Sequence, residues 1–171
     1  MMNRTSAVVL VGLFVAAGCL ATGGQQTPAP QGAQQQAGSK PDFSGTWVFQ
    51  PDRSSLESRV PDSSIFTIDH QDPHWHIERT HVFGGREDTL GFELLTDGVP
   101  VVREIRGVEL HMRLHWEEDT LVFESSYTQD GEETNVVVRY RLADEGRTFI
   151  AEERMEEKGD SHRNTWVFER Q

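Results

Sequence analysis

Phe43-Ser44-Gly45-Thr46-Trp47-Val48-Phe49 is the first strand-like segment of the chain, and it decides how the rest is interpreted. Phe43, Gly45, Trp47 and Phe49 alternate with smaller residues, so an extended chain places the aromatic side chains on one face. Gly45 in such a strand lets another backbone or a large ring approach closely. The segment therefore predicts the opening strand of a β-domain, with Trp47 either closing one end of a barrel or packed as an ordinary core aromatic of a sandwich.

The rest of the chain reads as short strands separated by turns. Segments rich in Val, Ile, Thr and aromatic residues alternate with turn signals such as Gly84-Gly85, Asp97-Gly98 and Asp130-Gly131. The predicted strands lie at 65–70, 75–83, 89–95, 101–105, 109–116, 121–127, 135–142, 148–155 and 164–169. This spacing predicts an all-β antiparallel meander of about 8–10 strands that closes into a barrel. A β-sandwich is the alternative.

The first 18 residues predict an export signal. Arg4 precedes an uninterrupted apolar run from Ala7 to Ala17, about half of the roughly 20 residues that a spanning helix needs. The following Ala16-Ala17-Gly18-Cys19 resembles a bacterial lipobox, which implies that Cys19 carries a lipid anchor. An ordinary signal peptide cut near Ala21 is the alternative. Leu20 rather than Asp follows the cysteine, which favours an outer-membrane lipoprotein facing the periplasm.

The mature chain divides into a tether and one domain. Residues 19–40 are rich in Gln, Gly, Ala, Thr and Pro and predict a disordered tether, and residues 41–171 predict the barrel domain. Cys19 is the only cysteine, which excludes an intrachain disulfide. The net charge is −12, and removal of residues 1–18 makes it −13 because one Arg and no acidic residue is lost. This charge repels nucleic acids and anionic headgroups, so neither is expected as a partner.

Four segments carry a family resemblance: 42–47, Pro51-Asp52-Arg53-Ser54, Thr96-Asp97-Gly98 and 116–122. Together they resemble a family of uncharacterised exported bacterial lipoproteins with a lipocalin-like (calycin-type) barrel. The resemblance implies the fold and export, but it brings no activity. In lipocalins an Arg packs on the opening Trp, and Arg163 or Arg170 could occupy that place here.

Two groups of residues could carry chemistry. His74, His76 and Glu78 lie on one side of a predicted strand, at a spacing that can bind zinc. A solvated outer face explains them better, because the alternate residues Trp75 and Ile77 are the ones expected to face the core. Arg79 and His81 share the inward parity, so they are either ligand contacts inside the barrel or residues at its mouth. The sequence contains no familiar catalytic motif, and we predict no catalytic residue and no cofactor.

Three functions remain open at this point. The first is a lipid-anchored cell-envelope protein that binds a small apolar ligand inside the barrel. The second is an envelope protein-interaction module with a filled barrel, and the third is a small metal-binding or enzymatic barrel. A closed cavity of a few hundred Å³ would favour the first over the second. The predicted ligand contacts are Trp47, Trp75, Arg79, His81, Phe92, Met112 and Tyr140.

Overall fold

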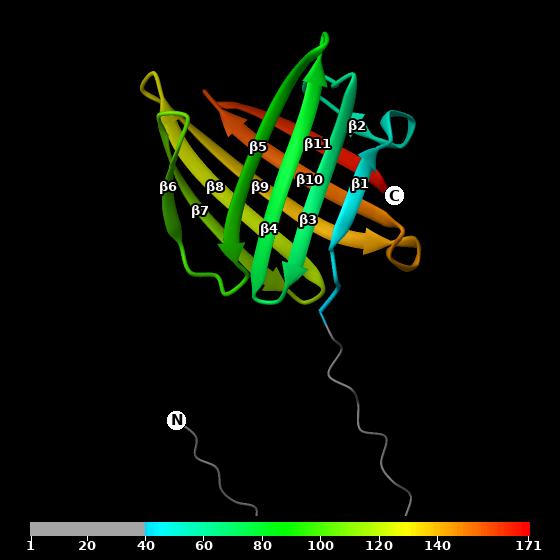
Figure 1. The fold of residues 1–171 in the computed structure, drawn as a ribbon. Helices are drawn as coiled ribbons and strands as arrows, with labels where there is room; N and C mark the ends of the chain where they lie inside the picture. The colour runs from blue at the N-terminus through cyan, green and yellow to red at the C-terminus, as the bar shows by residue number, and fades with distance from the viewer. Residues whose placement is uncertain (1–39) are drawn as a thin grey trace, which may run out of the picture. The chain divides into compact units, whose positions relative to one another are not determined.

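The computed structural model describes residues 40–171, which form an all-β domain (Figure 1). The predicted signal peptide and lipid anchor, and residues 19–39 of the predicted tether, lie outside the described residues. No helix in the described part of the chain is long and apolar enough to cross a membrane. The strands are β1 (Gly45–Phe49), β2 (Ser55–Leu56), β3 (Ser63–Gln71), β4 (His74–Phe83), β5 (Arg86–Leu95), β6 (Val101–Ile105), β7 (Val108–Glu117), β8 (Thr120–Gln129), β9 (Glu132–Ala143), β10 (Thr148–Glu157) and β11 (Asp160–Arg170). Two short 3-10 turns, Pro51–Arg53 and Asp144–Gly146, complete the described elements.

All the strands belong to one curled antiparallel sheet. Its order is β5-β4-β3-β1-β11-β10-β9-β8-β7-β6, and β2 pairs with β11 beside this path. Strands that follow one another along the chain are mostly neighbours in the sheet. β1 lies between β3 and the last strand, β11, and pairs with both. The predicted antiparallel meander is therefore confirmed. The strand count is 11 rather than 8–10, because the segment after Gln50 contributes the two-residue β2 that the sequence pattern did not reveal.

Alternation along each strand decides which side chains enter the core. Phe66 and Ile68 of β3 are buried while their neighbours Ile65, Thr67 and Asp69 are exposed. The β3–β4 register pairs Ile68 with Ile77 and Asp69 with His76, as the hairpin pattern predicts. In β7, Met112 and Leu114 are almost fully buried. Period-two patterning thus determines the inner and outer faces of the sheet.

Hydrogen bonds do not close the sheet into a complete barrel. Its order ends at β5 on one side and β6 on the other, and no strand pairing joins these two in the described chain. β6 pairs only with the stretch Val108–Met112 of β7. Beyond that stretch the β5–β6 connection, and not β6, pairs with β7. Gly98 N–H donates to the Leu114 carbonyl at 2.9 Å, and Asp97 forms a bridge with His115. The start of β6 is therefore displaced from β5.

The other end of the β5–β6 gap is joined by side chains. Arg106 follows β6 and donates to Asp88 Oδ1 at 2.6 Å and to the Thr89 carbonyl at 2.6 Å, both on β5. In the described chain no strand hydrogen bond joins β5 to β6 between the β5–β6 connection and these Arg106 contacts. We call this unpaired stretch between the two strands the lateral gap.

Trp47 lies beneath an arginine in a tightly packed region with Phe43 and Phe149, which we call the closed end. Its ring is fully buried, and the guanidinium carbon of Arg170 lies 4.3 Å from the ring centroid. Arg170 also donates to the carbonyls of Gly146 (3.0 Å) and Ser44. Gly45 has φ +134°, and a Cβ there would lie 2.8 Å from Arg170 Nη1. Gly45 is therefore required both by backbone conformation and by the space that Arg170 occupies, and Arg170, not Arg163, covers the tryptophan.

Candidate ligand-binding site

The interior of the barrel holds a cavity of about 250 Å³. Inward-facing side chains of β4, β5 and β7 to β11 form most of its wall, and most of them are apolar. Phe92 of β5 stacks on Phe123 of β8, with ring centroids 5.4 Å apart, so the two walls meet at this point. The lining residues are Phe66, Ile77, Arg79, His81, Leu90, Phe92, Ile105, Leu110, Met112, Phe123, Ser125, Tyr127, Val136, Val138, Tyr140, Ala151, Glu153, Met155 and Trp166.

Arg79 and His81 form a polar pair on the β4 wall of this cavity. Arg79 Nη1 lies 3.2 Å from His81 Nε2, and no carboxylate of the described residues lies within 4.0 Å of the Arg79 guanidinium. Burial, reinforced by the Arg79 charge, lowers the pKa of His81 to about 4, so its ring is neutral at pH 7. Because a guanidinium can only donate, Nε2 accepts from Arg79 and Nδ1 carries the proton.

The protonated Nδ1 of His81 has no acceptor among the described residues. His81 is only 6% exposed and stacks on Trp166 at 5.5 Å, so solvent access to this nitrogen is small. Its cross-strand partner Ser64 is also buried, and the Ser64 hydroxyl likewise lacks a described partner. Buried polar groups are normally hydrogen-bonded, so the His81 N–H on the cavity wall is available to a water molecule or a polar ligand group.

Glu153 is the acidic residue of the cavity wall. It accepts a hydrogen bond from Asn164 Nδ2 at 2.6 Å. The pKa of the neighbouring Tyr140 phenol is raised, mainly by burial and further by the charge of Glu153. The cavity is thus apolar along most of its wall, with one guanidinium and one carboxylate.

Five of the seven predicted ligand contacts line this cavity, and two do not. Arg79, His81, Phe92, Met112 and Tyr140 belong to the wall. Trp47 instead packs on Phe149 at 5.4 Å in the closed end, and Trp75 stacks on Tyr140 at 5.8 Å. Alternation predicts which side chains face the interior but not how far along the barrel axis each one lies. Both tryptophans are therefore predicted as ligand contacts although neither lines the cavity. Glu153 was missed, although it shares the inward parity of Ala151 and Met155.

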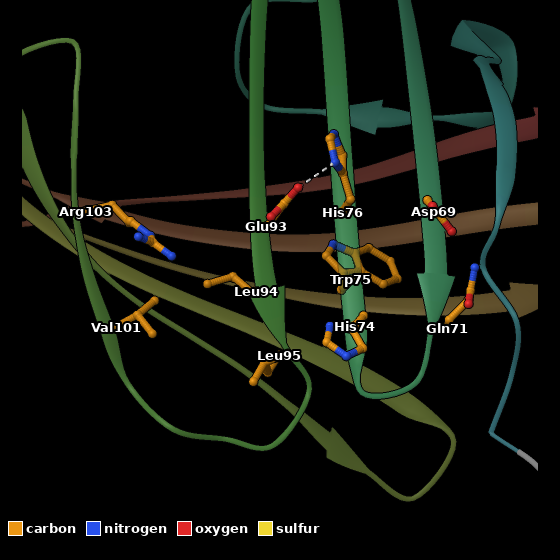
Figure 2. A pocket seen from close by; sticks show the side chains of 10 residues that line it. All are labelled: Asp69, Gln71, His74, Trp75, His76, Glu93, Leu94, Leu95, Val101 and Arg103. Atoms are coloured by element: carbon orange, nitrogen blue, oxygen red, sulfur yellow. Dashed lines mark ion pairs between the residues drawn. The ribbon is translucent and has the colours of Figure 1, made fainter. Parts of the chain in front are cut away.

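A second hollow, the outer groove, lies on the outside of the domain over the lateral gap (Figure 2). Its volume is about 490 Å³. Figure 2 shows Arg103 reaching from β6 toward Leu94 of β5, while His76 Nδ1 lies 3.4 Å from Glu93 Oε1. The groove is lined by Asp69, Gln71, His74, Trp75, His76, Glu93, Leu94, Leu95, Val101 and Arg103.

The outer groove is also where the zinc hypothesis placed its histidines. Among residues 40–171, no group of three or more His, Cys, Asp or Glu side chains is arranged to hold a metal ion. His76 faces Glu93, and its cross-strand neighbour Asp69 forms no ion pair with it among the described contacts. The arrangement therefore gives the metal-binding hypothesis no support.

Comparison with solved structures identifies the fold. The secretory abundant heat soluble protein 4 of Ramazzottius varieornatus matches with a TM-score of 0.54 at 13% identity, over 79% of this chain and 99% of that one. A Schistosoma mansoni fatty acid binding protein, solved in complex with arachidonic acid, matches with a TM-score of 0.50 at 10% identity, over 78% and 99% of the two chains. The domain therefore has a calycin-type β-barrel fold of the kind found in fatty acid binding proteins. No protein-family model and no curated protein matches the sequence.

Proposed function

We propose that this domain binds one small, largely apolar molecule in the interior of its barrel. The observation that carries the proposal is the apolar cavity of about 250 Å³, which lies close to the roughly 300–1,000 Å³ typical of small-molecule sites. A barrel filled by its own side chains would have suited an interaction module better.

The polar pair on β4 defines one end of the expected ligand. Arg79 offers a guanidinium without a carboxylate partner among the described residues, and His81 offers a buried N–H without an acceptor. Both groups donate, so a carboxylate or another strong acceptor on an otherwise apolar molecule complements them. A fatty acid is the first probe of this chemistry, and the arachidonic acid in the Schistosoma structure supports that choice.

A binding experiment with a fluorescent fatty acid tests the proposal. The full-length protein is expected to bind it with 1:1 stoichiometry, and Met112→Trp, which fills the cavity, is expected to abolish binding without unfolding the domain. Arg79→Gln is expected to weaken binding by roughly tenfold, the value of one charge-assisted hydrogen bond. Arg163→Gln on β11 is the matched control, because its side chain forms no described ion pair. Undiminished binding by Met112→Trp would contradict an interior site.

We further propose that the protein is exported and held at the outer membrane by a lipid on Cys19, facing the periplasm. The charged start, the short apolar run and the cysteine after Gly18 support this proposal. Cys19→Ala is expected to move the protein from the membrane fraction to the soluble periplasmic fraction. Continued membrane association of this variant would contradict the lipid anchor.

A further inference from the structure

The lateral gap brings the outer groove to the inner face of the sheet. Trp75, Leu94 and Val101 line the groove, yet the first two are inward-facing side chains that are 2% and 7% exposed. The next inward residues along the same strands, including Ile77 and Phe92, line the interior cavity. The linings of the groove and of the cavity therefore adjoin along β4 and β5.

The β6 side of the gap and groove combines apolar side chains with one positive charge. Leu94 of β5 and Val101 of β6 are apolar side chains that line the groove on the two sides of the gap. Arg103 shares the inward parity of Val101 because it pairs with Leu110 of β7, and no carboxylate of the described residues lies within 4.0 Å of its guanidinium. One side of the groove thus carries an unpaired positive charge.

The opposite side of the groove carries negative charge. Asp69, His76 and Glu93 form one cross-strand row on the outer face of β3, β4 and β5, and Glu93 is largely exposed. The two carboxylates face a groove whose β6 wall presents Arg103. This arrangement complements a group that carries both charges, with its negative part at β6 and its positive part at β3–β5.

We propose that the outer groove binds the zwitterionic headgroup of a single-chain amphiphile whose alkyl chain passes through the lateral gap into the interior cavity. The phosphate of the headgroup lies on Arg103, since a guanidinium matches phosphate oxygens bidentately, and the ammonium lies by Glu93 and Asp69. The inference rests on the proposed interior site for the apolar part. A headgroup without net charge also avoids the repulsion that the acidic domain imposes on anionic lipids.

Three amphiphiles with the same dodecyl-length chain test the headgroup site: a lysophosphatidylcholine, a lysophosphatidylglycerol and lauric acid, each below its critical micelle concentration. The full-length protein is expected to bind the zwitterionic lysolipid at least tenfold more tightly than the anionic one. Arg103→Gln is expected to weaken lysophosphatidylcholine binding by about tenfold and to leave lauric acid binding within about twofold. Glu93→Gln is expected to reduce the preference for the zwitterion over the anion. Arg163→Gln is the control.

The outcomes separate this inference from the interior site. Binding of lauric acid without lysophosphatidylcholine, or equal losses for both ligands in Arg103→Gln, overturns the headgroup site and leaves the interior site in place. Binding of none of the three amphiphiles overturns both. Because Arg103 and Glu93 are exposed, their substitution is not expected to unfold the domain, and circular dichroism of each variant verifies this.

Discussion

The closed end of the barrel and the part around the interior cavity, which we call the hollow half, have the same pattern of alternating apolar residues. Only the closed end is tightly packed. Phe43, Trp47 and Phe149 are fully buried at the closed end, with ring centroids 5.4–5.9 Å apart where they touch. In the hollow half Phe92 remains partly exposed beside a cavity, and Arg79 lies on the same inner face. A charged group cannot be packed dry without a partner, so the polar residues mark where the interior stays open.

The largest expected effect compares large-to-small substitutions in these two regions. Trp47→Ala is expected to lower the free energy of unfolding by about 4 kcal/mol, because it removes a fully buried ring and leaves a cavity that the packed end cannot collapse. Phe92→Ala is expected to cost about 1.5 kcal/mol, since its ring already borders empty space. Urea unfolding of both variants measures the difference. Equal losses would mean that the two regions are equally packed.

The second prediction concerns the pH dependence of stability in the hollow half. The folded state holds the pKa of His81 at about 4, mainly through burial, against 6.5 for the free side chain. Between these values the unfolded chain binds a proton that the folded chain does not, so the stability that His81 contributes is present above pH 6.5 and is lost as the pH falls toward 4. The full loss is about 3 kcal/mol.

His81→Phe provides the comparison for this pH effect. The variant lacks the titrating group, so its free energy of unfolding is expected to change less than that of the wild type between pH 6.5 and 4. Asp72 does not interfere within this window, because hydrogen bonds from Thr96 and Trp116 lower its pKa, and its contribution is lost at more acidic pH. Parallel stability curves for the two proteins would show that His81 is not the group responsible.

The sequence predicted the inner and outer faces of the sheet, but not the depth of each residue within the barrel. Alternation alone placed Met112 and Tyr140 inward, and both line the cavity. The same rule could not separate Trp47 from them, because height along the barrel depends on the strand order and register. The lateral gap was also invisible, since it arises from the Thr96–Pro100 connection bonding to β7 instead of turning tightly into β6. Such long-range pairing has no signature in local sequence.

The smallest expected effect tests how the closed end is sealed. Arg170→Met keeps an unbranched chain over the Trp47 ring but removes the charge and the donors to Ser44 and Gly146. We expect it to lower the free energy of unfolding by about 1 kcal/mol, the size of one exposed cation–π contact. Arg163→Met on the same strand is expected to change it by less than about 0.5 kcal/mol, as for most surface substitutions. Urea unfolding of the two variants measures the difference. Equal effects would show that the charge and hydrogen bonds of Arg170 contribute no stability beyond that of an ordinary surface residue. Arg170 does not line the interior cavity, so we expect Arg170→Met to leave fatty acid binding unchanged. That result would show that the closed end stabilises the barrel independently of the hollow half.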